Sequence, residues 1–249
     1  MSYEYLINNP IKCDGYRYFA KTDDASDVTI HYASDELDRN KIYSSYLANK
    51  IAKHLGFLVP KFELVYIERG NIAQSIMGYK RDDTIKWPIV VYHCNLGDAQ
   101  AIGPFPGSLK SLADRLYILD HLIMADDHAD RLYTMRDERG YDKVMLMNHH
   151  AFNGLDHKSD PLLMQNFRLS HKPTYFDYMS PTFNPYIFSD RITGLRKATR
   201  EILADLTRWC FSCNDDVVGI LDSYFMLRTK DFETFVRKAY DEDRERFKI

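Results

Sequence analysis

The sequence predicts an α+β fold with two lobes, a sheet-rich lobe over residues 1–100 and a helical lobe over residues 101–249, which together form one unit. Two observations favour this order. The first hundred residues contain several short runs of β-branched and aromatic residues, a composition typical of strands. From Ser108 onward, apolar residues recur at steps of three and four, which is the period of a helix with one buried face. The sequence lacks the regular strand–helix alternation that a doubly wound parallel sheet requires.

Composition narrows the class of protein further. The chain has 249 residues, of which 45% are hydrophobic, so it can bury a sizeable core without disulfide bonds. Its 33 Lys and Arg residues stand against 36 Asp and Glu residues without a basic block, which disfavours nucleic acid as the partner. No apolar run is long enough to cross a membrane. The N-terminus does not resemble a secretory signal and the four cysteines suit a reducing compartment, so we expect a cytoplasmic protein.

The N-terminal lobe is expected to be a sheet interrupted by one helix. In that helix Tyr43, Leu47, Ile51 and Leu55 fall on one face, and Gly56 ends it. The expected strands are 16–21, 28–32, 62–67, 72–77 and 89–92.

The C-terminal lobe is expected to begin with an amphipathic helix from Ser108, followed by a strand at 144–147 and by three helices near 192–209, 216–227 and 231–246. A long aromatic, Pro-containing stretch at 161–190 precedes those last helices. We interpret it as a loop packed across the helical lobe. The alternative is a recognition surface for a peptide or another protein.

Two segments combine ionisable and apolar residues. Residues 118–131 follow the amphipathic helix and contain several aspartates and histidines, and residues 144–152 form an apolar strand that ends in polar side chains. Acidic and imidazole groups at the ends of a helix and a strand can converge in one cleft and support metal or proton chemistry. The simpler alternative is that Asp126, Asp127 and Asp130 are the solvated end of a helix.

Four motifs resemble those of the HipA-like kinase family, relatives of bacterial toxin kinases that share motif logic with phosphatidylinositol kinases. Tyr18-Phe-Ala-Lys21 resembles the strand that ends in the ATP-binding lysine, and residues 48–60 resemble a helix that ends in L-G-x-x-V-P. Leu119-Asp-His-Leu-Ile-Met-Ala-Asp-Asp127 resembles the stretch leading into the catalytic loop. Leu146-Met-Asn-His-His-Ala-Phe152 resembles the metal-binding I-D-H-G-x-A-F segment. The resemblance spans roughly residues 16–152 and implies a protein-kinase-like fold with ATP and Mg²⁺ as cofactors.

Two positions retain the functional residue that the resemblance implies. Lys21 would contact the nucleotide phosphates as a point charge. Asp127 would be the catalytic aspartate that accepts the proton of the substrate hydroxyl.

Other positions depart from the family pattern. The helix glutamate that pairs with the lysine falls on Ser45, and the catalytic-loop Arg and His fall on His128 and Ala129. The loop metal ligand, an asparagine in the family, falls on Leu132. In the metal-binding segment the aspartate becomes Asn148 and the glycine becomes His150, beside His149. An alternative register assigns the catalytic role to Asp130 with Arg131 beside it, and it places Met135 at the loop metal position.

These departures leave three functional hypotheses. We interpret the chain as a pseudokinase, a module that binds a nucleotide, another ligand or a protein partner with weak or no phosphoryl transfer. The alternative is an active, atypical kinase in which Asp127 works with Asp126 or Asp130 as metal ligand. The third hypothesis is a metal-binding protein or metal-dependent hydrolase, a role for which the sequence offers its aspartates together with His121, His128, His149 and His150.

Overall fold

The structure is a computed structural model. It describes residues 8–14, 17–21, 26–32, 36–68, 86–94, 100–102, 104–125, 131–136, 142–146, 151–152, 167–209, 222–223, 226 and 228–248. Sheet and helix are both present, with most of the described strands before residue 101 and most of the described helix after it, so the α+β prediction is confirmed.

The N-terminal elements form a five-stranded antiparallel sheet in the order β1-β2-β3-β5-β4. Its strands are β1 (Asn8–Asp14), β2 (Arg17–Lys21), β3 (Asp27–Tyr32), β4 (Phe62–Glu68) and β5 (Lys86–Tyr92). Four of these agree with predicted strands, whereas β1 was not predicted. The strand predicted at 72–77 lies outside the described residues.

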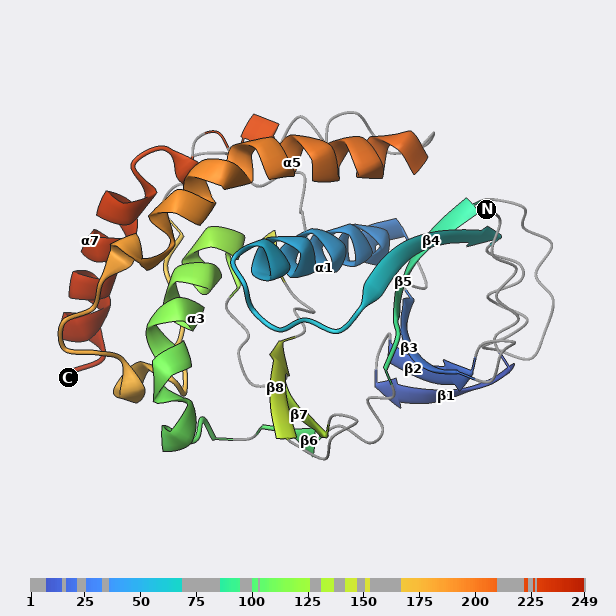
Figure 1. Ribbon diagram of the computed structural model, residues 1–249, viewed down its shortest axis with the longest axis horizontal. Coiled ribbons are helices and arrows are strands. Elements are labelled where there is room, and N and C mark those ends of the chain that lie inside the picture. Colours follow the sequence, from blue (N-terminus) through green and yellow to red (C-terminus); the bar gives the residue numbers. More distant parts are fainter. Residues whose placement is uncertain are drawn as a thin grey trace.

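The helix α1 (Glu36–His54) packs between this sheet and the C-terminal helices (Figure 1). The predicted face is buried: Tyr43, Leu47, Ile51 and Leu55 are each at most 3% exposed. Gly56 follows the helix with a φ of 83°, a left-handed conformation that glycine adopts without strain. The sequence pattern therefore placed both the buried face and the end of α1 correctly.

The C-terminal part is not purely helical, because it contains a three-stranded antiparallel sheet. The strands β6 (Gln100–Ala101), β7 (Leu132–Arg136) and β8 (Asp142–Leu146) pair in that order. Only β8 corresponds to a predicted strand. The family resemblance assigns Leu132 to the catalytic loop, whereas in the structure it is the first residue of β7, a strand whose alternation is too short to stand out without its partner strand.

The described C-terminal residues also form the helices α3 (Lys110–Ile123), α5 (Ser189–Trp209) and α7 (Phe232–Arg246), and the 3₁₀ turns η1 (Gly107–Leu109), η3 (Phe176–Tyr178) and η4 (Pro185–Phe188). In Figure 1, α3 and α7 lie to the left of the sheet of β6, β7 and β8, and α5 lies above α1. The helix predicted at 216–227 falls mostly on residues outside the description. Residues 222–223, 226 and 228–229 are helical.

One hydrophobic core joins the two parts of the molecule. It contains the inner face of α1, most of the second half of α3, and rings from the aromatic stretch. Tyr175, Phe176, Phe183 and Phe188 are each at most 4% exposed, which agrees with the packing interpretation of that stretch. Among the helices of the described ranges, none is both long and apolar enough to cross a membrane.

Candidate functional site

The segment that carries Asp126, Asp127, His128 and Asp130 lies outside the described residues, but the residues on both sides of it are placed. On its N-terminal side, α3 ends where Met124 adopts a left-handed φ of 51°. The amide of Ala125 donates to the carbonyl of Asp120 at 3.0 Å, and Ala125 is 1% exposed. The segment therefore starts from a fixed, buried point.

The C-terminal side of the same segment is fixed by a buried ion pair. The guanidinium of Arg131 pairs with the carboxylate of Asp120, with one nitrogen 2.6 Å from Oδ2 and the other against Oδ1. Tyr175 donates its hydroxyl to the same Oδ2. All three residues are at most 3% exposed. The pKa of Tyr175 is raised well above its usual value, mainly by burial and to a smaller extent by the charge of Asp120. The phenol therefore stays protonated and acts as a donor.

The second candidate segment leaves the protein core beside the first. Leu132, the first residue of β7, pairs with Leu146, the last residue of β8. In an antiparallel hairpin those two positions lie at the same end. Asn148, His149 and His150 lie outside the described residues, and buried Ala151 follows them. The described flanks of both candidate segments are thus neighbours, and the convergence of the candidate side chains themselves stays a prediction.

The position assigned to the loop metal ligand is occupied by a core side chain. Leu132 is 6% exposed and belongs to the hydrophobic core, and a leucine side chain offers no donor atom to a cation. In the alternative register the position falls on Met135, in the middle of β7, and a thioether does not suit Mg²⁺. Neither register supplies an oxygen ligand at this position.

Lys21 is the last residue of β2, where it pairs with Asp27 of β3 and with Asn8 of β1. Its side chain is not described. The strand that leads directly into α1 is β3, and β2 lies one strand further from the centre of the sheet. The role of Lys21 in nucleotide binding stays a prediction.

Ser45, the position of the family's helix glutamate, is part of a buried neutral cluster between α1 and β5. Its hydroxyl is hydrogen-bonded to that of Tyr92 at 3.1 Å. The amide nitrogen of Asn49 donates to Tyr92 Oη and to the Ser45 carbonyl, both at 2.8 Å. The ring of His31 on β3 packs on Tyr92 with centroids 4.7 Å apart, and all four residues are at most 1% exposed. We call Ser45, Asn49 and Tyr92 the neutral cluster.

The arrangement around His121 disfavours this residue as a metal ligand. Its Nδ1 donates to the carbonyl of Tyr117 at 2.9 Å, and its ring packs on the rings of Tyr117, Phe167 and Phe235. Burial lowers the pKa of His121 to about 3, so the imidazole is neutral at pH 7. Over the described residues, no group of three His, Cys, Asp or Glu side chains could hold a metal ion. His128, His149 and His150 lie outside them.

Sequence reasoning did not identify the tyrosine partners of Asp120 and Ser45. Asp120 and Arg131 both lie in the segment 118–131, but Tyr175 lies 55 residues from Asp120. Tyr92 lies 47 residues from Ser45, and nothing in the local sequence marks either tyrosine as a partner. The β-branched and aromatic composition of residues 28–32 was a hint that His31 belongs to a buried strand, and in the structure Val28 to Tyr32 are all buried.

Comparison with known proteins identifies the fold. No family model and no curated protein sequence matches the chain. Among solved structures, the proinflammatory kinase CtkA of Helicobacter pylori is similar with a TM-score of 0.56 and 10% identity, over 96% of this chain and 97% of that one. The Golgi casein kinase is similar with a TM-score of 0.52 and 11% identity, over 95% of this chain and 73% of that one. A second structure of the Golgi casein kinase, with Mn/ADP bound, gives the same TM-score.

These similarities establish a two-lobed, kinase-like fold. They extend over 95–96% of this chain. At 10–11% identity they carry the fold only.

Proposed function

We propose that this chain is a HipA-like kinase homologue that acts as a pseudokinase: a nucleotide- or ligand-binding or protein-interaction module with weak or no phosphoryl transfer. The observation that carries the proposal is Leu132, a core residue at the position where the resemblance expects a metal ligand. Phosphoryl transfer relies on divalent ions that neutralise developing charge on the phosphates. Losing about 3 kcal/mol of that stabilisation slows the step by about two orders of magnitude.

The neutral cluster supports the same proposal. In active protein kinases, a glutamate from the helix pairs with the phosphate-binding lysine and holds it in place. Ser45 has no charge, and its hydroxyl is engaged by Tyr92. A lysine in this region therefore has no helix carboxylate at that position to orient it, which lowers the expected affinity for nucleotide phosphates.

The remaining oxygen donors would have to bind any metal. Asn148 keeps an amide oxygen but lacks the negative charge that Mg²⁺ prefers, and Asp126, Asp127 and Asp130 are the carboxylates that the sequence offers beside it as ligands. A Mg²⁺ or Mn²⁺ ion held there would bridge and neutralise nucleotide phosphates. This donor set is compatible with weak metal binding.

Calorimetric titration of ATP, with and without Mg²⁺ or Mn²⁺, tests the proposal. We expect weak binding that Lys21→Ala abolishes, whereas Lys238→Ala, a matched change of an exposed lysine on α7, leaves it unchanged. Incubation with labelled ATP should yield no phosphorylated product. Robust autophosphorylation would overturn the pseudokinase proposal.

The second candidate is an active, atypical kinase, and the anchoring of the loop favours it. Asp120 holds both flanks of the segment 126–130, through the amide of Ala125 and the guanidinium of Arg131. An active kinase needs its catalytic aspartate held in place, whereas a pseudokinase has no catalytic need for this support. In this case Asp127→Ala or Asp130→Ala should abolish a measurable ATPase or kinase activity, and the variant that does so identifies the register.

A further inference from the structure

The C-terminal end of α1 meets the N-terminal end of α5 at a surface that carries two arginines. Arg191 donates to the carbonyl of Leu55, and Arg115 Nη2 donates to the carbonyl of Gly56 at 3.2 Å. His54 Nε2 is hydrogen-bonded to the carbonyl of Arg191 at 2.9 Å, which ties the two helices together. The last carbonyls of α1 therefore hold both guanidinium groups at neighbouring positions.

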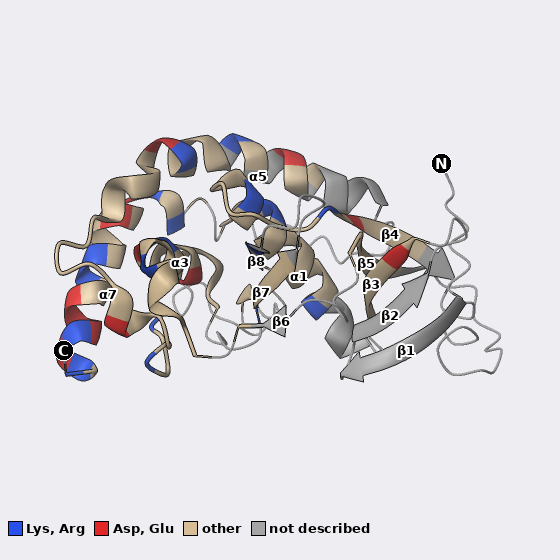
Figure 2. Cartoon of the chain, turned by 60° about the horizontal axis from the view of Figure 1, so that its bottom comes forward, with Lys and Arg blue, Asp and Glu red and all other residues tan. Residues whose placement is uncertain are grey.

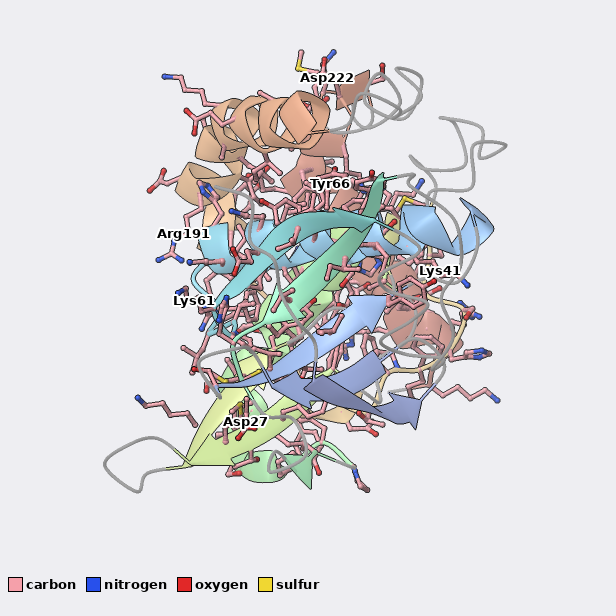
Figure 3. The ribbon with its side chains drawn as sticks, turned by 90° about the vertical axis from the view of Figure 1, so that its right-hand side faces the viewer. Asp27, Lys41, Lys61, Tyr66, Arg191 and Asp222 are labelled. Carbon is pink, nitrogen blue, oxygen red and sulfur yellow. The ribbon has the colours of Figure 1, made fainter. Side chains whose placement is uncertain are left out.

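The positive charge of these arginines is not balanced by nearby carboxylates. Within the described ranges, neither Arg115 nor Arg191 forms an ion pair. Burial, and then the charge of Arg191, lowers the pKa of Arg115, as expected for two cations in proximity. Lys61 is exposed on the same side of the molecule as Arg191 (Figure 3). Asp190 lies in the first turn of α5, where its carboxylate interacts favourably with the helix dipole.

Apolar side chains flank this charge. The Arg115 guanidinium lies over the rings of Phe57 and Phe188, 4.8 and 5.4 Å from their centroids. The chain neighbours of these two rings point outward instead: Leu58 is 45% exposed and Ile187 is 49% exposed. Tyr186 beside them is 62% exposed, the largest value among the large hydrophobic residues with high exposure. Arginine with exposed aromatic and aliphatic groups is the composition enriched at protein interfaces.

We propose that this surface, formed by Leu58, Lys61, Arg115, Tyr186, Ile187 and Arg191, is a docking site for a protein partner and binds a peptide segment in which carboxylates flank an apolar side chain. We call it the basic–apolar surface. The carboxylates would meet Arg191 and Lys61, and the apolar side chain would pack on the exposed Tyr186 and Ile187 of η4. The proposal is independent of the pseudokinase proposal, because it uses none of the residues assigned to nucleotide or metal.

A peptide partner fits this charge pattern better than a phosphate polymer does. The chain carries a net charge of −3, which opposes the long-range attraction on which binding of nucleic acid or an anionic membrane depends. Acidic residues are interspersed with basic ones along α5 and α7 (Figure 2). A short acidic peptide needs only a local group of cations beside apolar side chains in order to bind.

Fluorescence anisotropy tests the docking proposal with labelled peptides titrated against the full chain. The probe is a peptide of about twelve residues in which two leucines are flanked by glutamates, and its partner probe carries Gln in place of Glu. We expect saturable binding of the first probe, at least about tenfold tighter than that of the second. Ile187→Asp should weaken binding about tenfold and Lys61→Glu about threefold. Both residues are exposed, so folding is retained, whereas Arg191 is left unchanged because it caps α1.

Matched variants elsewhere provide the controls. Lys238→Glu, 72% exposed, and Met226→Asp, 44% exposed, make the same chemical changes and should leave the affinity unchanged. Absence of saturable binding overturns the proposal. Three other results also overturn the proposal: equal losses of affinity in the test and control variants, equal affinity for the Gln probe, and binding to phosphatidylserine vesicles in place of the acidic peptide.

Discussion

Asp120 and Arg131 form a buried ion pair that joins the end of α3 to the start of β7. The pair spans the chain segment to which the candidate catalytic aspartates belong. The hydroxyl of Tyr175, from the aromatic stretch, donates to the same carboxylate. The ion pair therefore fixes two points of the chain that lie 11 positions apart, on either side of those aspartates.

Removing the charge of Asp120 should destabilise the protein strongly. Asp120→Asn leaves the guanidinium of Arg131 buried without a counter-charge, and we expect a loss of about 3–5 kcal/mol in the free energy of unfolding. Tyr175→Phe removes one hydrogen bond and should cost about 1–2 kcal/mol. Urea denaturation measures both. Equal losses in the two variants would contradict a dominant role for the ion pair.

Gly56→Ala should be destabilising, whereas the same change at Gly194 should not. Gly56 has a φ of 83°, and a Cβ there would collide with a guanidinium nitrogen of Arg191, so the arginine must leave the carbonyl of Leu55. We expect a loss of about 1–2 kcal/mol from the backbone conformation alone. Gly194 lies inside α5, where an added Cβ meets His54 at an ordinary 3.7 Å. Gly194→Ala should therefore stabilise the helix by up to about 1 kcal/mol, and thermal unfolding compares the two.

The burial of His121 should make stability depend on acid. Its pKa falls from 6.5 to about 3 in the folded protein, so between these values the unfolded chain binds the additional proton. The contribution of His121 is complete above about pH 6.5 and is lost as the pH falls towards 3, by up to about 1.4 kcal/mol per pH unit. His121→Gln should flatten the plot of unfolding free energy against pH in this window. Parallel curves for the variant and the wild type would refute this assignment.

The hydroxyl of Tyr92 should contribute more to stability than that of Tyr66, a partly buried tyrosine on the neighbouring strand. Tyr92→Phe leaves the buried amide of Asn49 and the hydroxyl of Ser45 without their shared partner, at a cost of about 1–3 kcal/mol. Tyr66 donates to Tyr43 over 3.4 Å, a long hydrogen bond, so Tyr66→Phe should cost less than about 0.5 kcal/mol. Denaturant titration of both variants decides the order.

The sequence predicted elements whose pattern is contained within one segment. The buried face of α1 and its end at Gly56 follow from local spacing and one residue type, and so do α3 and most strands of the larger sheet. β1 was missed because an edge strand with a polar sequence and Pro10 has no clear alternation. β7 was missed because its identity as a strand depends on pairing with β8.

The sequence alone thus determined the α+β class, the position of α1, and which residue types are available for phosphoryl-transfer chemistry. Only the tertiary structure decided what those residues contact: Leu132 faces the core, Ser45 meets Tyr92, and Asp120 meets Tyr175. Helical periodicity is a property of residues a few positions apart, whereas these contacts join positions that folding alone brings together. The physical reason is that a hydrogen bond or a packed side chain depends on distance in space, which sequence separation does not specify.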